Sequence, residues 1–113
     1  MPRLVKCRRV CQIPDNRLFM PERQSAGKVT LSMEQLEALR LCDLEGLPQD
    51  EGAKRMDISR GTFQRILYSA RRLTAQALVE GLSIEIAGGN YQLSNSCCAK
   101  GLPCQACKFS NTK

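Results

Sequence analysis

Residues 48–79 read PQDEGAKRMDISRGTFQRILYSARRLTAQALV. They predict a short helix over about 48–56, a tight turn at 56–58 and a long helix that opens at Ser59. Serine is a favourable N-cap residue, and aspartate, here Asp57, is one of the few residues besides glycine that tolerates the left-handed conformation of such a turn. The stretch therefore predicts a helix-turn-helix whose second helix lies in the DNA major groove.

The long helix combines an apolar stripe with a basic face. Apolar or small side chains recur at helical spacing, at Phe63, Ile66, Leu67, Ala70, Leu73, Thr74, Ala77 and Leu78. The opposite face has no acidic residue between Ser59 and Val79. Arginine pairs with guanine, glutamine with adenine, and threonine contacts the thymine methyl group. We therefore expect base contacts from Arg60, Thr62, Gln64 and Arg65.

Phosphate contacts are expected from neighbouring basic side chains, since these position a protein on the duplex. The full predicted DNA-binding set is Arg60, Thr62, Gln64, Arg65, Tyr68, Arg71, Arg72, Lys54, Arg55, Arg8 and Arg9. The plainer alternative is a basic face that only contacts water.

The segments before the turn have clear helix signals. Ser32 and Gln35 fit a capping box at the start of a first helix, and Gly46 is suited to end it. We expect the outer face of this helix to carry the acidic residues Glu34, Glu37, Asp43 and Glu45. Arg40 is spaced to pair with Glu37 or Asp43. In the short helix, Pro48 is tolerated at the first position, Ala53 is small where helices must approach, and Gly52 weakens the helix.

Charge and cysteine are unevenly distributed over the 113 residues, whose net charge is +6. Residues 1–28 carry seven Lys and Arg against two acids, which predicts a basic arm that contacts phosphates. The alternative is a solvated terminus, ordered where Val10 and Ile13 pack on the core. A basic balance favours a polyanionic partner.

Seven cysteines and no histidine limit the metal chemistry available. The tail sequence CCAKGLPCQAC places four thiols close together, and the CxxC spacing suits one metal ion. The candidate ligands for zinc or an iron–sulfur cluster are Cys97, Cys98, Cys104 and Cys107, with Cys7 or Cys11 as a further member in place of Cys97 or Cys98. A thiol-rich tail without metal is the alternative. Cys42 is expected to be a small core residue.

The remaining patterns restrict the class of protein. Residues 82–86 and 91–93, separated by Gly88-Gly89-Asn90, predict a short β-hairpin. No apolar run approaches the about 18 residues that span a bilayer, and no signal peptide is predicted, so a cytoplasmic location is expected. Without histidine, a nucleophile elbow or a phosphate-binding glycine loop, an enzyme is not expected.

Four stretches, in the same order along residues 1–93, resemble uncharacterised protein family 0251, the domain of unknown function 134 group. They are MPRLVKCRRV (1–10), LSMEQLEALRLCDLEGL (31–47), SRGTFQRILYSARR (59–72) and GGNY (88–91). The resemblance implies a DNA-binding protein with a fold similar to the promoter-reading domain of sigma factors. This chain departs from the family pattern at Gly52, where relatives usually have alanine, at Asp57, where they have glycine, and in its short loop 15–29. The tail after Tyr91 lies outside these motifs.

We therefore predict a mainly α, winged-helix-like protein that resembles sigma region 4. Residues 1–30 form a basic arm and loop, 31–80 a three-helix helix-turn-helix domain, 81–93 a short extended segment or hairpin, and 94–113 a Cys-rich tail. The expected function is sequence-specific binding of double-stranded DNA in transcriptional regulation, with a homodimer as one expected state. The alternatives are a metal- or redox-responsive sensor controlled by the tail cysteines, and a protein-interaction module.

Overall fold

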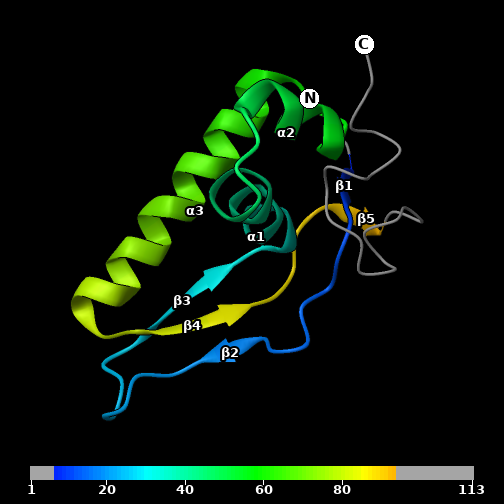
Figure 1. Cartoon of the computed structure of the whole chain (residues 1–113). Coiled ribbons are helices and arrows are strands. Elements are labelled where there is room, and N and C mark those ends of the chain that lie inside the picture. The colour runs from blue at the N-terminus through cyan, green and yellow to red at the C-terminus, as the bar shows by residue number, and fades with distance from the viewer. Residues whose placement is uncertain (1–6, 94–113) are drawn as a thin grey trace, which may run out of the picture.

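The structure is a computed structural model that describes residues 7–93. Three α-helices, one π-helical turn and five short strands make up this part of the chain (Figure 1). In chain order they are β1 (Arg8–Val10), β2 (Leu18–Phe19), β3 (Lys28–Leu31), α1 (Met33–Leu39), η1 (Arg40–Leu44), α2 (Gln49–Met56), α3 (Arg60–Glu80), β4 (Ser83–Ile86) and β5 (Tyr91–Leu93). The expected mainly α fold is therefore corrected to a compact mixed α/β fold.

Local capping residues set the helix ends as the sequence predicts. The Ser32 hydroxyl accepts the backbone N–H of Gln35, whose side chain accepts the Ser32 N–H, so the capping box is confirmed. Ser59 caps α3 by accepting the Thr62 N–H. Gly46 and Gly81 have φ values of +78° and +70° beyond the ends of η1 and α3, which is the left-handed conformation that stops a helix. Pro48 is the N-cap of α2, one residue outside its predicted place.

The strands form two sheets whose pairings connect distant parts of the sequence. β4 lies between β2, to which it is antiparallel, and β3, to which it is parallel. β1 and β5 pair in parallel, with Arg8 opposite Tyr91. The predicted hairpin of 82–86 with 91–93 is therefore wrong: both strands exist, but each pairs with the segment before α1. That segment supplies three strands within 7–31, where the sequence predicted a basic arm and loop.

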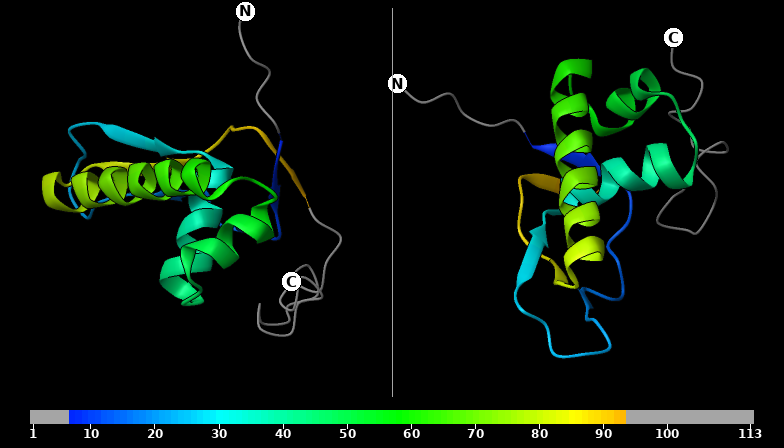
Figure 2. Two further views of the ribbon diagram at one scale, coloured as in Figure 1. Left: turned by 90° about the horizontal axis from the view of Figure 1, so that it is seen from above. Right: turned by 90° about the vertical axis from the view of Figure 1, so that its left-hand side faces the viewer.

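The helices enclose the main core. In the right-hand view of Figure 2, α1 extends from behind α3, and α2 lies beside the N-terminal half of α3. One core cluster joins Cys11, Ala38, Leu41, Ala53, Met56, Phe63 and Leu67. A second joins Leu31, Met33, Ala70 and Ile86, so α3 packs on both the helices and the sheet. The predicted stripe of α3 is buried at four of its positions, but Leu78 is 75% exposed, although the preceding residue, Ala77, is buried.

Close packing of α2 on α3 depends on Gly52. A Cβ atom built on Gly52 would lie 2.5 Å from the Cζ atom of the Phe63 ring, which is fully buried. The sequence suggested only that Gly52 weakens α2. In the structure, the missing side chain of Gly52 also leaves the space that the Phe63 ring occupies.

The acidic face of α1 is only partly exposed, contrary to expectation. Glu37 is 2% exposed, forms an ion pair with Arg40 at 2.8 Å and accepts the Cys11 N–H at 3.2 Å. Glu34 is also buried and accepts the Asn90 N–H at 3.1 Å. These carboxylates attach the chain before β2 and the turn after β4 to α1. The predicted pairing of Arg40 with Glu37 is confirmed, in a nearly dry site.

Gly52→Ala should lower the free energy of unfolding by about 1–3 kcal/mol because the added methyl group displaces the Phe63 ring from a close-packed core. Helix propensity alone predicts the opposite sign, a gain of about 1 kcal/mol. Urea denaturation monitored by circular dichroism measures the change. Gly61→Ala is the matched control, since a Cβ atom there meets nothing closer than Arg65 Nη1 at 3.9 Å. A Gly52→Ala protein as stable as the control would contradict this account of the packing.

Candidate nucleic-acid interface

The connection between α2 and α3 is short and well ordered by its own residues. Asp57 adopts φ 60° and ψ 44°, the left-handed conformation predicted for it, and its N–H meets the carbonyls at the end of α2. The Ile58 N–H donates to the Ala53 carbonyl at 3.0 Å, and the Ile58 side chain packs against the core cluster. Three residues, 57–59, thus turn the chain from α2 into α3.

The N-terminal half of α3 presents its polar side chains to solvent. Arg60, Gly61, Arg65, Tyr68 and Arg72 are exposed, and Thr62 and Gln64 are half-buried. By helical spacing, Arg65, Tyr68 and Arg72 lie on the side of α3 opposite the buried residues Phe63, Leu67 and Ala70, and Thr62 and Gln64 flank that side. The structure therefore leaves Arg65, Tyr68 and Arg72, three of the predicted contacts, exposed together on one side of α3.

Hydrogen bonds along this surface hold several of the side chains in place. The Thr62 hydroxyl accepts from Ser59 at 3.0 Å and from Arg65 at 3.3 Å. Gln64 donates to the Tyr68 hydroxyl at 3.1 Å. A hydrogen bond with Gln49, and to a smaller extent one with Gln64, lowers the pKa of Tyr68. Such local bonds restrict the rotamers of the exposed groups and so reduce the entropy that a ligand must overcome.

Two of the arginines on α3 already face carboxylates. Arg71 makes a two-pronged contact with Asp43 of η1, with N–O distances of 2.8 and 3.1 Å, and its guanidinium carbon lies 5.9 Å from the Tyr68 ring centroid. This contact was not predicted, because Asp43 lies 28 positions earlier in the sequence. Arg60 lies 3.3 Å from Asp50 in an exposed pair, which contributes little in water.

Lys54 and Arg55 differ although they are adjacent on α2. Lys54 is exposed, as a phosphate contact requires. Arg55 is only 1% exposed and its Nε atom lies 3.1 Å from Glu51 Oε2. The expectation that Arg55 contacts phosphate is therefore corrected, because in this fold the side chain points into the protein and pairs within its own helix.

Arg8 and Arg9 belong to β1 rather than to a free arm. The Arg9 guanidinium donates to the carbonyls of Arg55 at 2.6 Å and Lys54 at 2.9 Å. These carbonyls are among the last of α2, where a cation is favoured by the helix dipole. Arg9 therefore connects β1 to the end of α2. Arg8 is half-buried, and its Nε atom has no hydrogen-bond partner within 7–93.

The cysteines within the described residues do not form a metal site. Cys7 is exposed, Cys11 is buried in the core cluster and Cys42 is half-buried. Burial, followed by the charge of Asp43, raises the pKa of the Cys42 thiol. Over residues 7–93 no group of three or more His, Cys, Asp or Glu side chains is placed to hold a metal ion. Cys97, Cys98, Cys104 and Cys107 lie outside the described residues.

Among the helices of residues 7–93, none combines the length and apolar character that crossing a membrane requires.

Comparisons with protein families and with individual proteins relate this chain to the same family. Residues 1–94 match a family described as "Protein of unknown function DUF134". The chain is similar to a UPF0251 protein of Ruminiclostridium cellulolyticum, with 53% identity over 102 residues that cover 88% of this chain and 80% of the relative. It is also similar to a UPF0251 protein of Dehalococcoides mccartyi, with 46% identity over 107 residues that cover 91% and 92% of the two chains. No solved structure matches it.

Arg9→Gln should lower the free energy of unfolding by about 1–3 kcal/mol, since charged hydrogen bonds to the end of α2 are lost. Lys54→Gln removes a neighbouring positive charge from an exposed position and should change stability by less than about 0.5 kcal/mol. Thermal and urea denaturation of both variants measure the difference. Equal stabilities would mean that Arg9 does not hold α2.

Proposed function

The chain belongs to the DUF134 (UPF0251) family, and on the geometry of its α2–α3 unit we propose that it binds duplex DNA as a transcriptional regulator. In this proposal α2, the turn 57–59 and α3 act as a helix-turn-helix, and the N-terminal half of α3 enters the major groove. The observation that carries the proposal is the exposed, acid-free face of α3 directly after a three-residue turn.

The form of the turn supports this reading. Helix-turn-helix units join their two helices by three or four residues and insert the N-terminal end of the second helix into the groove. Here Asp57 makes the left-handed turn, and Ile58 anchors it to the core. The first turn of α3 is exposed on the same side as its basic face, so nothing within 7–93 covers the end that would enter the groove.

The chemistry of the face supports contact with base edges and phosphates in different parts of α3. Arg60, Thr62, Gln64 and Arg65 lie in its first two turns, where base edges are reached, and can donate to or touch these edges. Arg72 lies two turns after Arg65 and, with Lys54 of α2, suits phosphate contact. Arg71 fits this role less well, because Asp43 already balances its charge.

Arg65→Ala should weaken binding to the preferred site by about 1–3 kcal/mol and relax the preference at one base pair, because a base contact is lost. Fluorescence anisotropy on a library of single-base variants of the selected site measures both effects. An unchanged base preference at every position would show that Arg65 does not contact a base.

Arg72→Ala should weaken binding to all duplexes and lower the slope of log K against log salt by about one, because one phosphate contact is lost. Lys28→Ala is the matched control, since Lys28 lies on β3 and pairs with Glu85. It removes the same charge from the sheet and should leave the slope nearly unchanged. Equal effects of the two variants would indicate attraction by net charge alone.

A further inference from the structure

The hydroxyl group of Tyr68 meets glutamine side chains from two helices. Gln64, one turn earlier on α3, donates an N–H to it at 3.1 Å, and Gln49 at the start of α2 forms a second hydrogen bond with it. Both bonds lower the pKa of Tyr68, as groups that donate to the phenol oxygen do, because donors stabilise its charged form. The Tyr68 oxygen therefore accepts from two glutamines.

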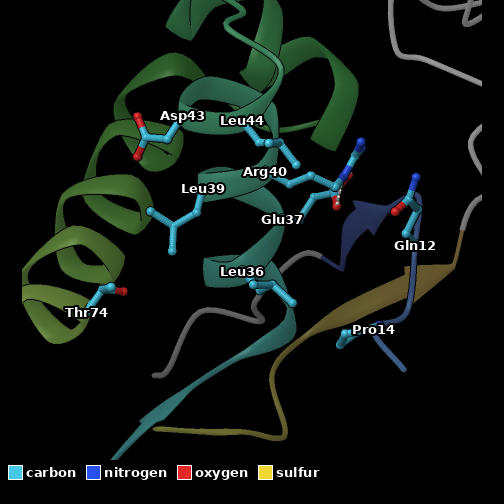
Figure 3. A pocket seen from close by; sticks show the side chains of 9 residues that line it. All are labelled: Gln12, Pro14, Leu36, Glu37, Leu39, Arg40, Asp43, Leu44 and Thr74. Atoms are coloured by element: carbon cyan, nitrogen blue, oxygen red, sulfur yellow. Dashed lines mark hydrogen bonds and ion pairs between the residues drawn. The ribbon is translucent and has the colours of Figure 1, made fainter. Parts of the chain in front are cut away.

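The ring that carries this hydroxyl group is restrained by a charged pair, although Tyr68 is 49% exposed. The Arg71 guanidinium carbon lies 5.9 Å from the ring centroid, within the range of a cation–π contact. Arg71 is fixed by its two bonds to Asp43 of η1, which lines the pocket in Figure 3 and points its carboxylate toward α3. A chain of contacts therefore runs from Asp43 through Arg71 and Tyr68 to Gln64.

The bond to Tyr68 determines which groups of Gln64 are left for a ligand. A glutamine amide has one carbonyl oxygen, which accepts, and two N–H groups, which donate. One N–H donates to Tyr68, so one acceptor and one donor remain. In the major groove, adenine presents one donor and one acceptor, whereas guanine presents two acceptors. The remaining groups of Gln64 are therefore complementary to adenine.

We propose that Tyr68 is a positioning residue that makes Gln64 select adenine. This inference rests on the proposed function, since it concerns a base pair that the first two turns of α3 contact. Tyr68 acts by holding the amide of Gln64, and Gln64 itself contacts the base. The preferred DNA site then has adenine at the position that Gln64 contacts.

Restraint of the Gln64 amide favours adenine in two ways. An unrestrained amide can rotate to offer its N–H groups to the acceptors of guanine or thymine, so it discriminates weakly between bases. The bond to Tyr68 opposes this rotation, because the N–H that it holds would have to leave the hydroxyl group. A side chain that is half-buried and already bonded, as Gln64 is, also loses less rotamer freedom when it binds a base.

Binding of the full chain to single-base variants of its selected site, followed by fluorescence anisotropy, tests the inference. Gln64→Ala should lower the preference at one base pair by about 5–150-fold, which identifies the pair that Gln64 contacts. Tyr68→Phe should lower the preference for adenine at that pair by about 2–10-fold, because one hydrogen bond is lost, and change no other position. Tyr91→Phe is the matched control, since it removes the same hydroxyl group from the other tyrosine of the chain, and it should change no preference.

The double variant with Gln64→Ala and Tyr68→Phe separates positioning from direct contact. It should have the affinity and base preference of Gln64→Ala alone, because the group that Tyr68 holds is already gone. Additive losses would mean that Tyr68 itself contacts DNA, and would overturn the inference. An adenine preference that Tyr68→Phe leaves unchanged would overturn it too, as would selection of guanine at this position by the wild-type chain.

NMR of the ¹⁵N-labelled full chain without DNA separates failure of this inference from failure of the proposed function. The side-chain NH₂ signals of Gln64, identified by their loss in Gln64→Ala, should shift in Tyr68→Phe, which keeps the ring and removes only the hydroxyl group. They should not shift in Tyr91→Phe. Unshifted signals in Tyr68→Phe would overturn the inference and keep the proposed function. Shifted signals in a chain that has no salt-dependent affinity for any duplex would overturn the proposed function, and with it the selection of adenine.

Discussion

The contact of the Phe63 ring with the backbone of Gly52 is the constraint on which the rest of the molecule depends. The ring fills the space that a Cβ atom on Gly52 would need, so α2 and α3 pack closely at this point. Asp57 then makes the left-handed turn between them, and Ile58 packs beneath it. With the core side of α3 fixed in this way, the opposite side with Arg65 and Arg72 must face solvent.

The positively charged side chains near the α2–α3 unit fall into two groups, those that bind other parts of the protein and those that are exposed. Arg9 and Arg55 are held within the protein, one on the last carbonyls of α2 and the other against Glu51. Lys54, Arg65 and Arg72 remain exposed. Composition counts all five as equal contributions to a basic protein, but only exposed charges can replace counterions on a phosphate backbone. In the proposed function, the number of phosphate contacts is therefore expected to be smaller than the number of arginines suggests.

Local features of the fold could be predicted from the sequence, and distant pairings could not. The caps at Ser32 and Ser59, the stop at Gly81 and the turn at Asp57 depend on residues within four positions of one another. The burial of Glu34 and Glu37 depends on the N–H groups of Asn90 and Cys11, which lie 56 and 26 positions away. A charged residue on an amphipathic helix is normally solvated, so the burial of these two carboxylates could not be predicted from sequence. The same limit explains why the predicted hairpin was wrong: β4 pairs with β2 and β3, and β5 pairs with β1, all of which precede α1. For the candidate interface, the face of α3 could be predicted, whereas the engagement of Arg71 by Asp43 and of Arg9 by α2 required the tertiary structure.

In the proposed function, one polar face of α3 contacts DNA and the sheet does not. Titration of the ¹⁵N-labelled full chain with duplex DNA, followed by NMR, tests this placement most directly. We expect the amide signals of residues 54 and 59–72 to shift together, to return as salt is added, and to leave those of β2, β3 and β4 unchanged. Shifts centred on the sheet, or no shift at any salt concentration, would contradict the account.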